Sequence, residues 1–162
     1  MQVWIGLTAA VLSIIAYIPY AIDTAAGRTR PQRASWLIWS VLSIIAFSAQ
    51  FYEGASTSLW FAGSQAIASV LIFGLSLRSG KGGILKSSDY ITLVLAGVGL
   101  LLWYLTETAA YTLVITITIS LLGGVATATK AWHDPESETL MTWVISLVAS
   151  VLAILSLSLI HI

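Results

Sequence analysis

The chain has 162 residues, of which 58% are hydrophobic and 9% charged, with a net charge of zero and no cysteine. Soluble domains carry roughly 25% charged residues, so the composition favours a membrane protein over a water-soluble one. A net charge of zero argues against nucleic-acid binding as a main role. The absence of cysteine excludes disulfides, thiolate nucleophiles and sulfur-rich metal sites, and the length predicts a single domain, residues 1–162.

Six apolar segments are each long enough to cross a hydrocarbon core of about 30 Å as a helix. They are residues 3–22, 35–52, 57–77, 90–106, 108–126 and 140–160. Backbone groups cannot remain unpaired in lipid, so each segment is predicted to be helical. The expected fold is therefore all-α, a polytopic transmembrane bundle of six helices. The fourth and fifth spans meet at residues 106–108, which predicts a tight hairpin.

All seven Lys and Arg residues lie in three polar segments, residues 23–34, 78–89 and 127–139. Basic residues are retained on the cytoplasmic side of membrane proteins, so these segments should share the cytoplasmic face of the plasma (inner) membrane, with both termini outside. The N-terminus lacks the basic region of a secretory signal, so the first span is expected to be retained. The glycines of segment 78–89 predict a flexible cytoplasmic linker between a three-helix unit, residues 1–77, and a second unit, residues 90–162.

Two segments share one pattern, in which a proline is followed four residues later by a hydroxyl residue and after four more by a tryptophan. The two sets are Pro31, Ser35 and Trp39, and Pro135, Thr139 and Trp143. Each set opens a span directly after a polar segment, where Ser35 and Thr139 are expected to be N-caps. The pattern predicts a parallel internal repeat, in which helices 1–2 correspond to helices 5–6. Chance similarity between two helix starts is the alternative.

The first half resembles the PQ-loop module, the three-helix unit of SWEET-type sugar transporters and their half-size bacterial relatives. Residues 17–20, Tyr-Ile-Pro-Tyr, stand where that family has its Pro-Gln pair, with Tyr20 in place of the Gln. Gln65 lies near the position of the family's pore Asn. The resemblance covers residues 13–77 well and 120–150 weakly, and the chain also resembles small bacterial membrane proteins. It implies transport of a small molecule by a helical bundle.

No Asp, Glu, Lys, Arg or His lies in the middle of any predicted span. Ionisable groups inside membranes usually mark proton relays, ion pathways or catalysis, so their absence argues against a proton-coupled pump and against an enzyme. No cofactor is expected. The acidic segment 133–138 lacks a regular ligand spacing and suits a negatively charged helix N-terminus, so no metal site is expected either.

Neutral polar and aromatic side chains are the remaining candidates for binding. Gln65 must face the bundle interior or a cavity, because an unpaired amide in lipid is costly. Trp39 and Trp143, at equivalent positions of the repeat, could flank a central cavity in which aromatic faces hold a flat neutral ligand. Ser43 and Tyr20 complete the expected substrate-binding set. The structural alternatives are an aromatic belt at the membrane interface and hydrogen bonds between helices.

Two functional hypotheses follow. In the first, the chain is a transporter or carrier-like protein for a small neutral solute, which binds near the midplane between the repeats, with Pro19 as a hinge. In the second, it is a non-catalytic membrane subunit with an assembly, lipid-binding or scaffold role. The expected partners are the lipid bilayer, a small neutral solute, and a second copy or another membrane protein, but no nucleic acid.

Overall fold

The computed structural model describes residues 2–52, 57–83, 94, 98, 101 and 109–158. These residues form five α-helices and one short 3-10 helix, with no β-strand among them. The elements are α1 (Gln2–Ala25), α2 (Arg33–Tyr52), α3 (Thr57–Ser79), α5 (Ala109–His133), η1 (Pro135–Ser137) and α6 (Leu140–Ser158). The predicted all-α class is thereby confirmed. The fourth span, residues 90–106, and the hairpin at 106–108 lie outside the described residues except at positions 94, 98 and 101, which are helical.

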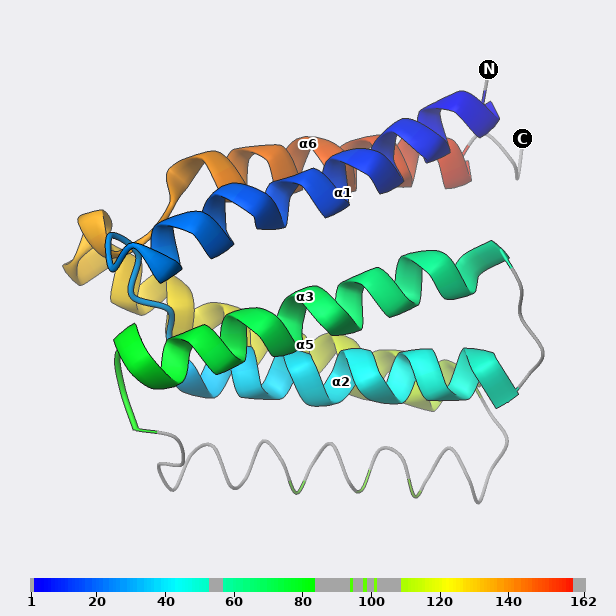
Figure 1. The fold of residues 1–162 in the computed structure, drawn as a ribbon. Helices are drawn as coiled ribbons and strands as arrows, with labels where there is room; N and C mark the ends of the chain where they lie inside the picture. Colours follow the sequence, from blue (N-terminus) through cyan, green and yellow to red (C-terminus); the bar gives the residue numbers. More distant parts are fainter. Residues whose placement is uncertain are drawn as a thin grey trace.

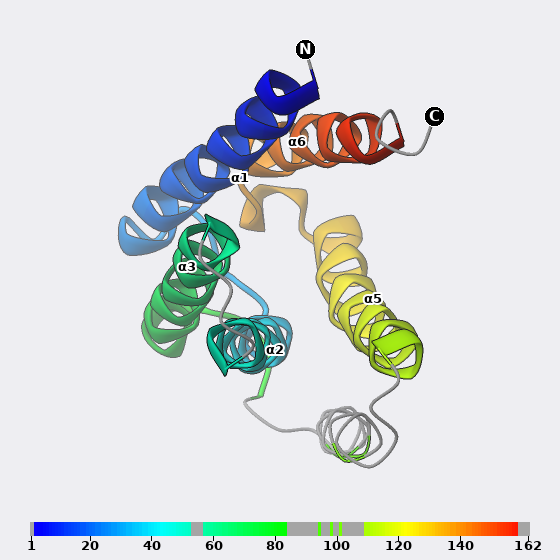
Figure 2. The ribbon, with the colours of Figure 1, turned by 90° about the vertical axis from the view of Figure 1, so that its right-hand side faces the viewer.

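The helices lie side by side and run between two ends of the molecule (Figure 1). Helix α1 packs along α6 and α3, while α2 packs along α3 and α5. Viewed down the helices, the α1–α6 pair and the α2–α3 pair form adjoining parts of one bundle, with α5 beside them (Figure 2). The start of α1 and the end of α6 lie at one end, and the connections from α1 to α2 and from α5 to α6 lie at the other.

The described helices begin and end close to the bounds of the predicted spans, except at the C-terminal end of α5. That helix continues to His133, beyond residue 126, where the predicted span ended. Within the described residues, one helical segment, Trp4–Ala25, is both long and apolar enough to cross a membrane. Shorter apolar stretches occupy Arg33–Ser48 in α2 and Leu140–Leu152 in α6.

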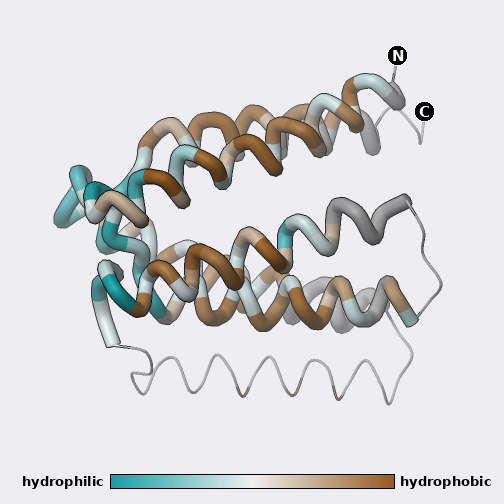
Figure 3. Tube along the Cα trace, viewed as in Figure 1, coloured by the Kyte–Doolittle hydropathy of each residue, from teal (hydrophilic) through white to brown (hydrophobic). Residues whose placement is uncertain are grey.

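Many large hydrophobic side chains are exposed in the described residues, and the buried positions hold hydroxyl as well as apolar side chains. Large hydrophobic side chains are exposed on every described α-helix, including Ile67 on α3, Leu121 on α5 and Leu147 on α6. Hydroxyl side chains such as Ser40 and Ser76 are instead buried between helices. Soluble proteins keep large aliphatic residues inside, whereas helices in lipid pack through small and hydroxyl residues. Figure 3 shows the apolar colour along the helices and the hydrophilic colour at the loop end.

The connection after α3 is fixed to the start of α2 by backbone hydrogen bonds. The Lys81 amide donates to the Pro31 carbonyl over 2.9 Å, and the Arg33 amide donates to the Lys81 carbonyl over 3.1 Å. The Arg33 guanidinium also donates to the carbonyls of Ser76 (2.9 Å) and Gly82 (2.6 Å). Residues 80–83 are therefore held in place, in contrast to the flexible linker that the glycines predicted.

Gly80 is the tightest point of this connection. A Cβ there would lie 2.5 Å from the Ser76 carbonyl oxygen and 2.7 Å from the Pro31 carbonyl oxygen, both of which are backbone atoms. We expect Gly80→Ala to lower the free energy of unfolding by about 1–3 kcal/mol, because the backbone must shift to admit the methyl group. Gly74→Ala is the matched control on α3, where a Cβ meets nothing within 4 Å. Denaturant unfolding of both variants in detergent measures the difference, and equal stability would contradict the argument.

Candidate functional site

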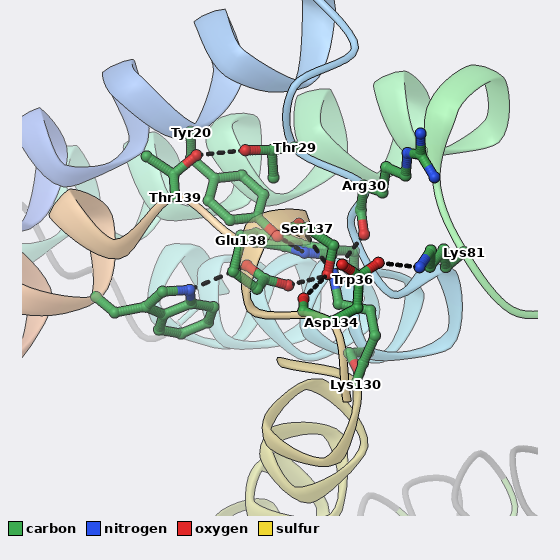
Figure 4. A network of polar contacts seen from close by, with 12 residues as sticks. Tyr20, Thr29, Arg30, Trp36, Lys81, Lys130, Asp134, Ser137, Glu138 and Thr139 are labelled. Atoms are coloured by element: carbon green, nitrogen blue, oxygen red, sulfur yellow. Dashed lines mark hydrogen bonds and ion pairs between the residues drawn. The ribbon is translucent and has the colours of Figure 1, made fainter. Parts of the chain in front are cut away.

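The three polar segments meet at the loop end of the bundle. The Arg30 amide donates to the Ser137 carbonyl over 2.9 Å, the Lys130 ammonium donates to the Arg30 carbonyl, and Lys81 pairs with Asp134. Figure 4 shows how these side chains converge from the different segments. We call this network the polar cap; it consists of Asp23, Thr29, Arg30, Lys81, Lys130, Asp134, Ser137, Glu138 and Thr139. The predicted grouping of the segments at one end is thus present in the described residues.

Neither predicted N-cap uses its hydroxyl to cap its own helix. Helix α2 already begins at Arg33, so Ser35 lies in its first turn, and the Ser35 hydroxyl donates to the Gly123 carbonyl of α5 over 2.8 Å. Thr139 directly precedes α6, but its hydroxyl donates to the Asp23 carboxylate over 2.9 Å and also contacts the Thr29 hydroxyl. Both side chains join different parts of the bundle, because buried hydroxyls near a neighbouring segment find acceptors there.

The charged groups of the polar cap differ greatly in burial. The side chains of Lys130 and Glu138 are only 9% and 5% exposed and form an ion pair at 2.5 Å. Lys81 and Asp134 are each 37% exposed, so solvent screens their interaction. Burial lowers the pKa of the Lys130 ammonium, and the pair with Glu138 offsets this only in part.

A cavity of about 500 Å³ lies between α1, α2, α3, α5 and α6. Four aromatic side chains line it: Tyr17, Trp36, Trp39 and Trp143. Gln65 and several serines and threonines supply the polar part of the wall, and no Asp, Glu, Lys, Arg or His lines it. Pockets of this size hold small molecules. The described wall is thus aromatic, amide- and hydroxyl-bearing, and uncharged.

The fold brings together four of the five predicted substrate-binding residues, because Trp39, Gln65, Trp143 and Ser43 all line the cavity. Tyr20 lies behind the wall: it is fully buried, and its hydroxyl accepts a hydrogen bond from the Trp36 indole over 3.2 Å. Pro19 lies within α1 and does not line the cavity.

Trp36 and Tyr17 line the cavity but were not selected from the sequence. Trp36 precedes Trp39 by three residues, which places both on one face of α2. That spacing could have identified Trp36, but its place at the predicted helix start favoured an interfacial anchor. Tyr17 and Trp36 form an edge-on aromatic contact, with ring centroids 6.1 Å apart.

The tryptophans form the end of the cavity nearest the polar cap. The ring centroids of Trp39 and Trp143 lie 6.3 Å apart, and those of Trp36 and Trp39 lie 5.1 Å apart. Each indole N–H already has a protein acceptor: the Tyr20 hydroxyl for Trp36, the Ser120 carbonyl for Trp39 and the Glu138 carboxylate for Trp143. The indoles therefore present apolar ring surfaces rather than free donors to the cavity.

Comparison of the chain with protein-family models, with curated proteins and with solved structures finds no match in any of the three.

The Lys81–Asp134 pair predicts a small acid-dependent loss of stability. The hydrogen bond from Lys81 lowers the pKa of the Asp134 carboxyl, so the folded state releases this proton more readily than the unfolded state. The resulting stabilisation is complete above the ordinary Asp pKa of about 3.9. It is lost as the pH falls through the lower pKa that Asp134 has in the folded state. We expect Asp134→Asn to remove this part of the acid dependence.

The measurement is the thermal midpoint of parent and variant between pH 7 and pH 2.5. The midpoints should differ by a few degrees or less at neutral pH and converge at the acid end. Glu136→Gln, an exposed acid in the same turn, is the control and should leave the pH profile unchanged. A constant difference at every pH would contradict a charge-based role of Asp134.

Proposed function

We propose that this chain is an integral membrane protein that carries a small neutral solute across the inner membrane by means of its central cavity. The observation that carries the proposal is the uncharged, aromatic wall formed by residues from α1, α2, α3, α5 and α6. A charged ligand bound there would lose its hydration without gaining a counter-ion, which is costly. A neutral ligand with a flat face can instead pack on the indole rings and exchange hydrogen bonds with the amide and hydroxyl groups.

The surface supports a location in the bilayer. Exposed aliphatic side chains surround the described helices, while hydrophilic residues gather at the loop end of the bundle, where the polar cap lies (Figure 3). A charged end adjoining an apolar bundle is the pattern of a membrane protein whose basic loops stay in the cytoplasm. The proposal retains six spans, with the polar cap in the cytoplasm and both termini outside.

Two pairs of contacts support the proposed parallel repeat. Helix α1 packs against α6, and α5, its proposed counterpart, packs against α2, the counterpart of α6. The equivalent residues Trp39 and Trp143 contact each other, as expected for residues beside an axis that relates two similar units. Transporters built from such repeats bind substrate at the repeat interface. The resemblance of residues 13–77 to the PQ-loop module is consistent with this arrangement.

The polar cap lies beyond the tryptophan end of the cavity, and we propose that it closes the cavity on that side. The three tryptophans form its wall on that side, and beyond them the segments 23–34 and 127–139 are joined by hydrogen bonds. A carrier must expose its site to one side at a time, so a closed cap end suits one state of an alternating-access cycle. Pro19 remains the proposed hinge, since proline removes one backbone hydrogen bond from α1.

The test is ligand binding by the whole chain in lipid nanodiscs. A panel of uncharged sugars, nucleosides, nucleobases and vitamins is screened by thermal shift and by tryptophan fluorescence, and hits are tested for uptake into proteoliposomes. We expect at least one solute to raise the melting temperature and to be transported. Trp39→Leu should weaken binding roughly tenfold, because it removes an aromatic contact worth about 1–1.5 kcal/mol.

Trp132→Leu is the matched control, because Trp132 is 85% exposed and lies outside the cavity. It should leave binding unchanged. The alternative is a non-catalytic membrane subunit. It would be favoured if no neutral solute binds and the protein consistently purifies with a second membrane protein, and that result would contradict the carrier proposal.

A further inference from the structure

The most unusual group outside the cavity is the buried ion pair between Lys130 and Glu138. Lys130 belongs to the last turn of α5, and Glu138 lies between η1 and α6. Both side chains are almost completely enclosed. Burying two charges is costly even when they are paired, so their position next to the cavity wall calls for an explanation.

The two carboxylate oxygens of Glu138 have different partners. One oxygen pairs with the Lys130 ammonium at 2.5 Å. The other accepts the indole N–H of Trp143 over 3.0 Å, and the Trp143 ring lines the cavity. A single buried side chain therefore connects the polar cap to the cavity wall, and movement of Trp143 away from Glu138 breaks a charge-assisted hydrogen bond.

Lys130 joins three parts of the chain at once. An ammonium group has three N–H donors, and that of Lys130 contacts the Glu138 carboxylate, the Arg30 carbonyl and the Ser137 carbonyl. These acceptors belong to the α1–α2 connection, to η1 and to the residue after η1. Removing the ammonium would leave the α1–α2 connection joined to the segment before α6 by the Arg30 amide and by Thr139, but without the link between that connection and Glu138.

We propose that the Lys130–Glu138 pair is a latch that keeps the cap end of the cavity closed, and that Glu138 is a positioning residue that links the latch to the binding wall through Trp143. This inference rests on the proposed carrier function, which it deepens by assigning the closure of the site to two residues. The exposed pairs Lys81–Asp134 and Arg28–Asp23 contact no residue of the cavity wall and have no such role.

Charged and titratable groups surround the latch from several elements. Tyr20 on α1 interacts with the Glu138 carboxylate of the latch. The charges of Lys81 and Asp134 act on the Lys130 ammonium. Burial lowers the pKa of Lys130 below its ordinary value, so the ammonium loses its proton at a lower pH than an exposed lysine. The latch should consequently weaken with rising alkalinity at a lower pH than pairs formed by exposed lysines.

The experiment uses the absence of cysteine in the chain. Ser146→Cys places a single thiol in the cavity wall on α6, and a membrane-impermeant maleimide is applied separately to intact cells and to inverted membrane vesicles. In the parent background we expect slow labelling from the side of the polar cap. Lys130→Gln and Glu138→Gln should each accelerate labelling from that side roughly tenfold or more, since each leaves one enclosed charge without its partner in the closed state, and that cost is large enough to bias a two-state equilibrium by this factor. The double variant should also accelerate labelling, because it removes the contacts of the Lys130 ammonium with the Arg30 and Ser137 carbonyls.

The double variant guards against misfolding, because it leaves no uncompensated buried charge. The matched control combines Lys81→Gln with Asp134→Asn and removes an ion pair of the same cap that does not contact Trp143; it should leave labelling unchanged. Trp143→Phe retains an aromatic ring but cannot donate to Glu138, so it should also accelerate labelling from the cap side. Trp132→Phe, the same change at an exposed tryptophan, should leave labelling from the cap side unchanged.

The outcomes separate the two proposals. Unchanged labelling from the cap side in all latch variants, with a thiol that reacts from the opposite side, overturns the latch and leaves the carrier function intact. A thiol that reacts from neither side in any folded variant contradicts an accessible cavity, and with it the carrier function. If the Lys81→Gln/Asp134→Asn control accelerates labelling as much as the latch variants do, closure belongs to the polar cap as a whole. That result would overturn the specific role of Lys130 and Glu138.

Discussion

The contact between the Lys130 ammonium and the Glu138 carboxylate is the interaction around which the loop end is organised. It is almost fully enclosed, so water screens it far less than the other ion pairs of the polar cap. Through Arg30 and Ser137, Lys130 fixes the α1–α2 connection to the segment before α6. Through Trp143, Glu138 fixes one wall of the cavity. The same pair thus contacts both the α1–α2 connection and a tryptophan of the cavity wall.

Elsewhere in the described residues, buried hydroxyl groups share the interior with apolar side chains, while many large apolar side chains are exposed. Hydroxyl groups bind carbonyl oxygens, as Ser35 does across α2 and α5 and as Ser40 does within α2. Small side chains allow close approach: a Cβ at Gly123 would lie 3.1 Å from the Trp39 indole nitrogen. Packing through small and hydroxyl residues is typical of helices in lipid. The described helices also leave a central space lined by hydroxyl, amide and aromatic groups.

Several features of the site could be predicted from local sequence because they depend on few residues. The repeated Pro–hydroxyl–Trp spacing selected Trp39 and Trp143, and the cost of an unpaired amide in lipid selected Gln65; all three line the cavity. Tyr20, which stands in place of the Gln of the PQ-loop pair, was also expected in the wall, whereas Trp36 lies between Tyr20 and the cavity. Sequence spacing shows which residues share a helix face, but the neighbouring helix decides which of them is covered.

The sequence by itself determined the helical class, the approximate helix positions and the grouping of the polar segments at one end, because hydrophobic length and charge distribution are local properties. Only the tertiary structure decided the partners of the polar groups. Ser35 and Thr139 bond to other segments rather than capping their own helices, and the glycine-rich connection at 80–83 is held by Pro31 and Arg33. Burial is a property of the assembled bundle. The sequence places Lys130 and Glu138 eight residues apart in one polar segment, and this spacing does not predict that they form an enclosed pair beside the cavity.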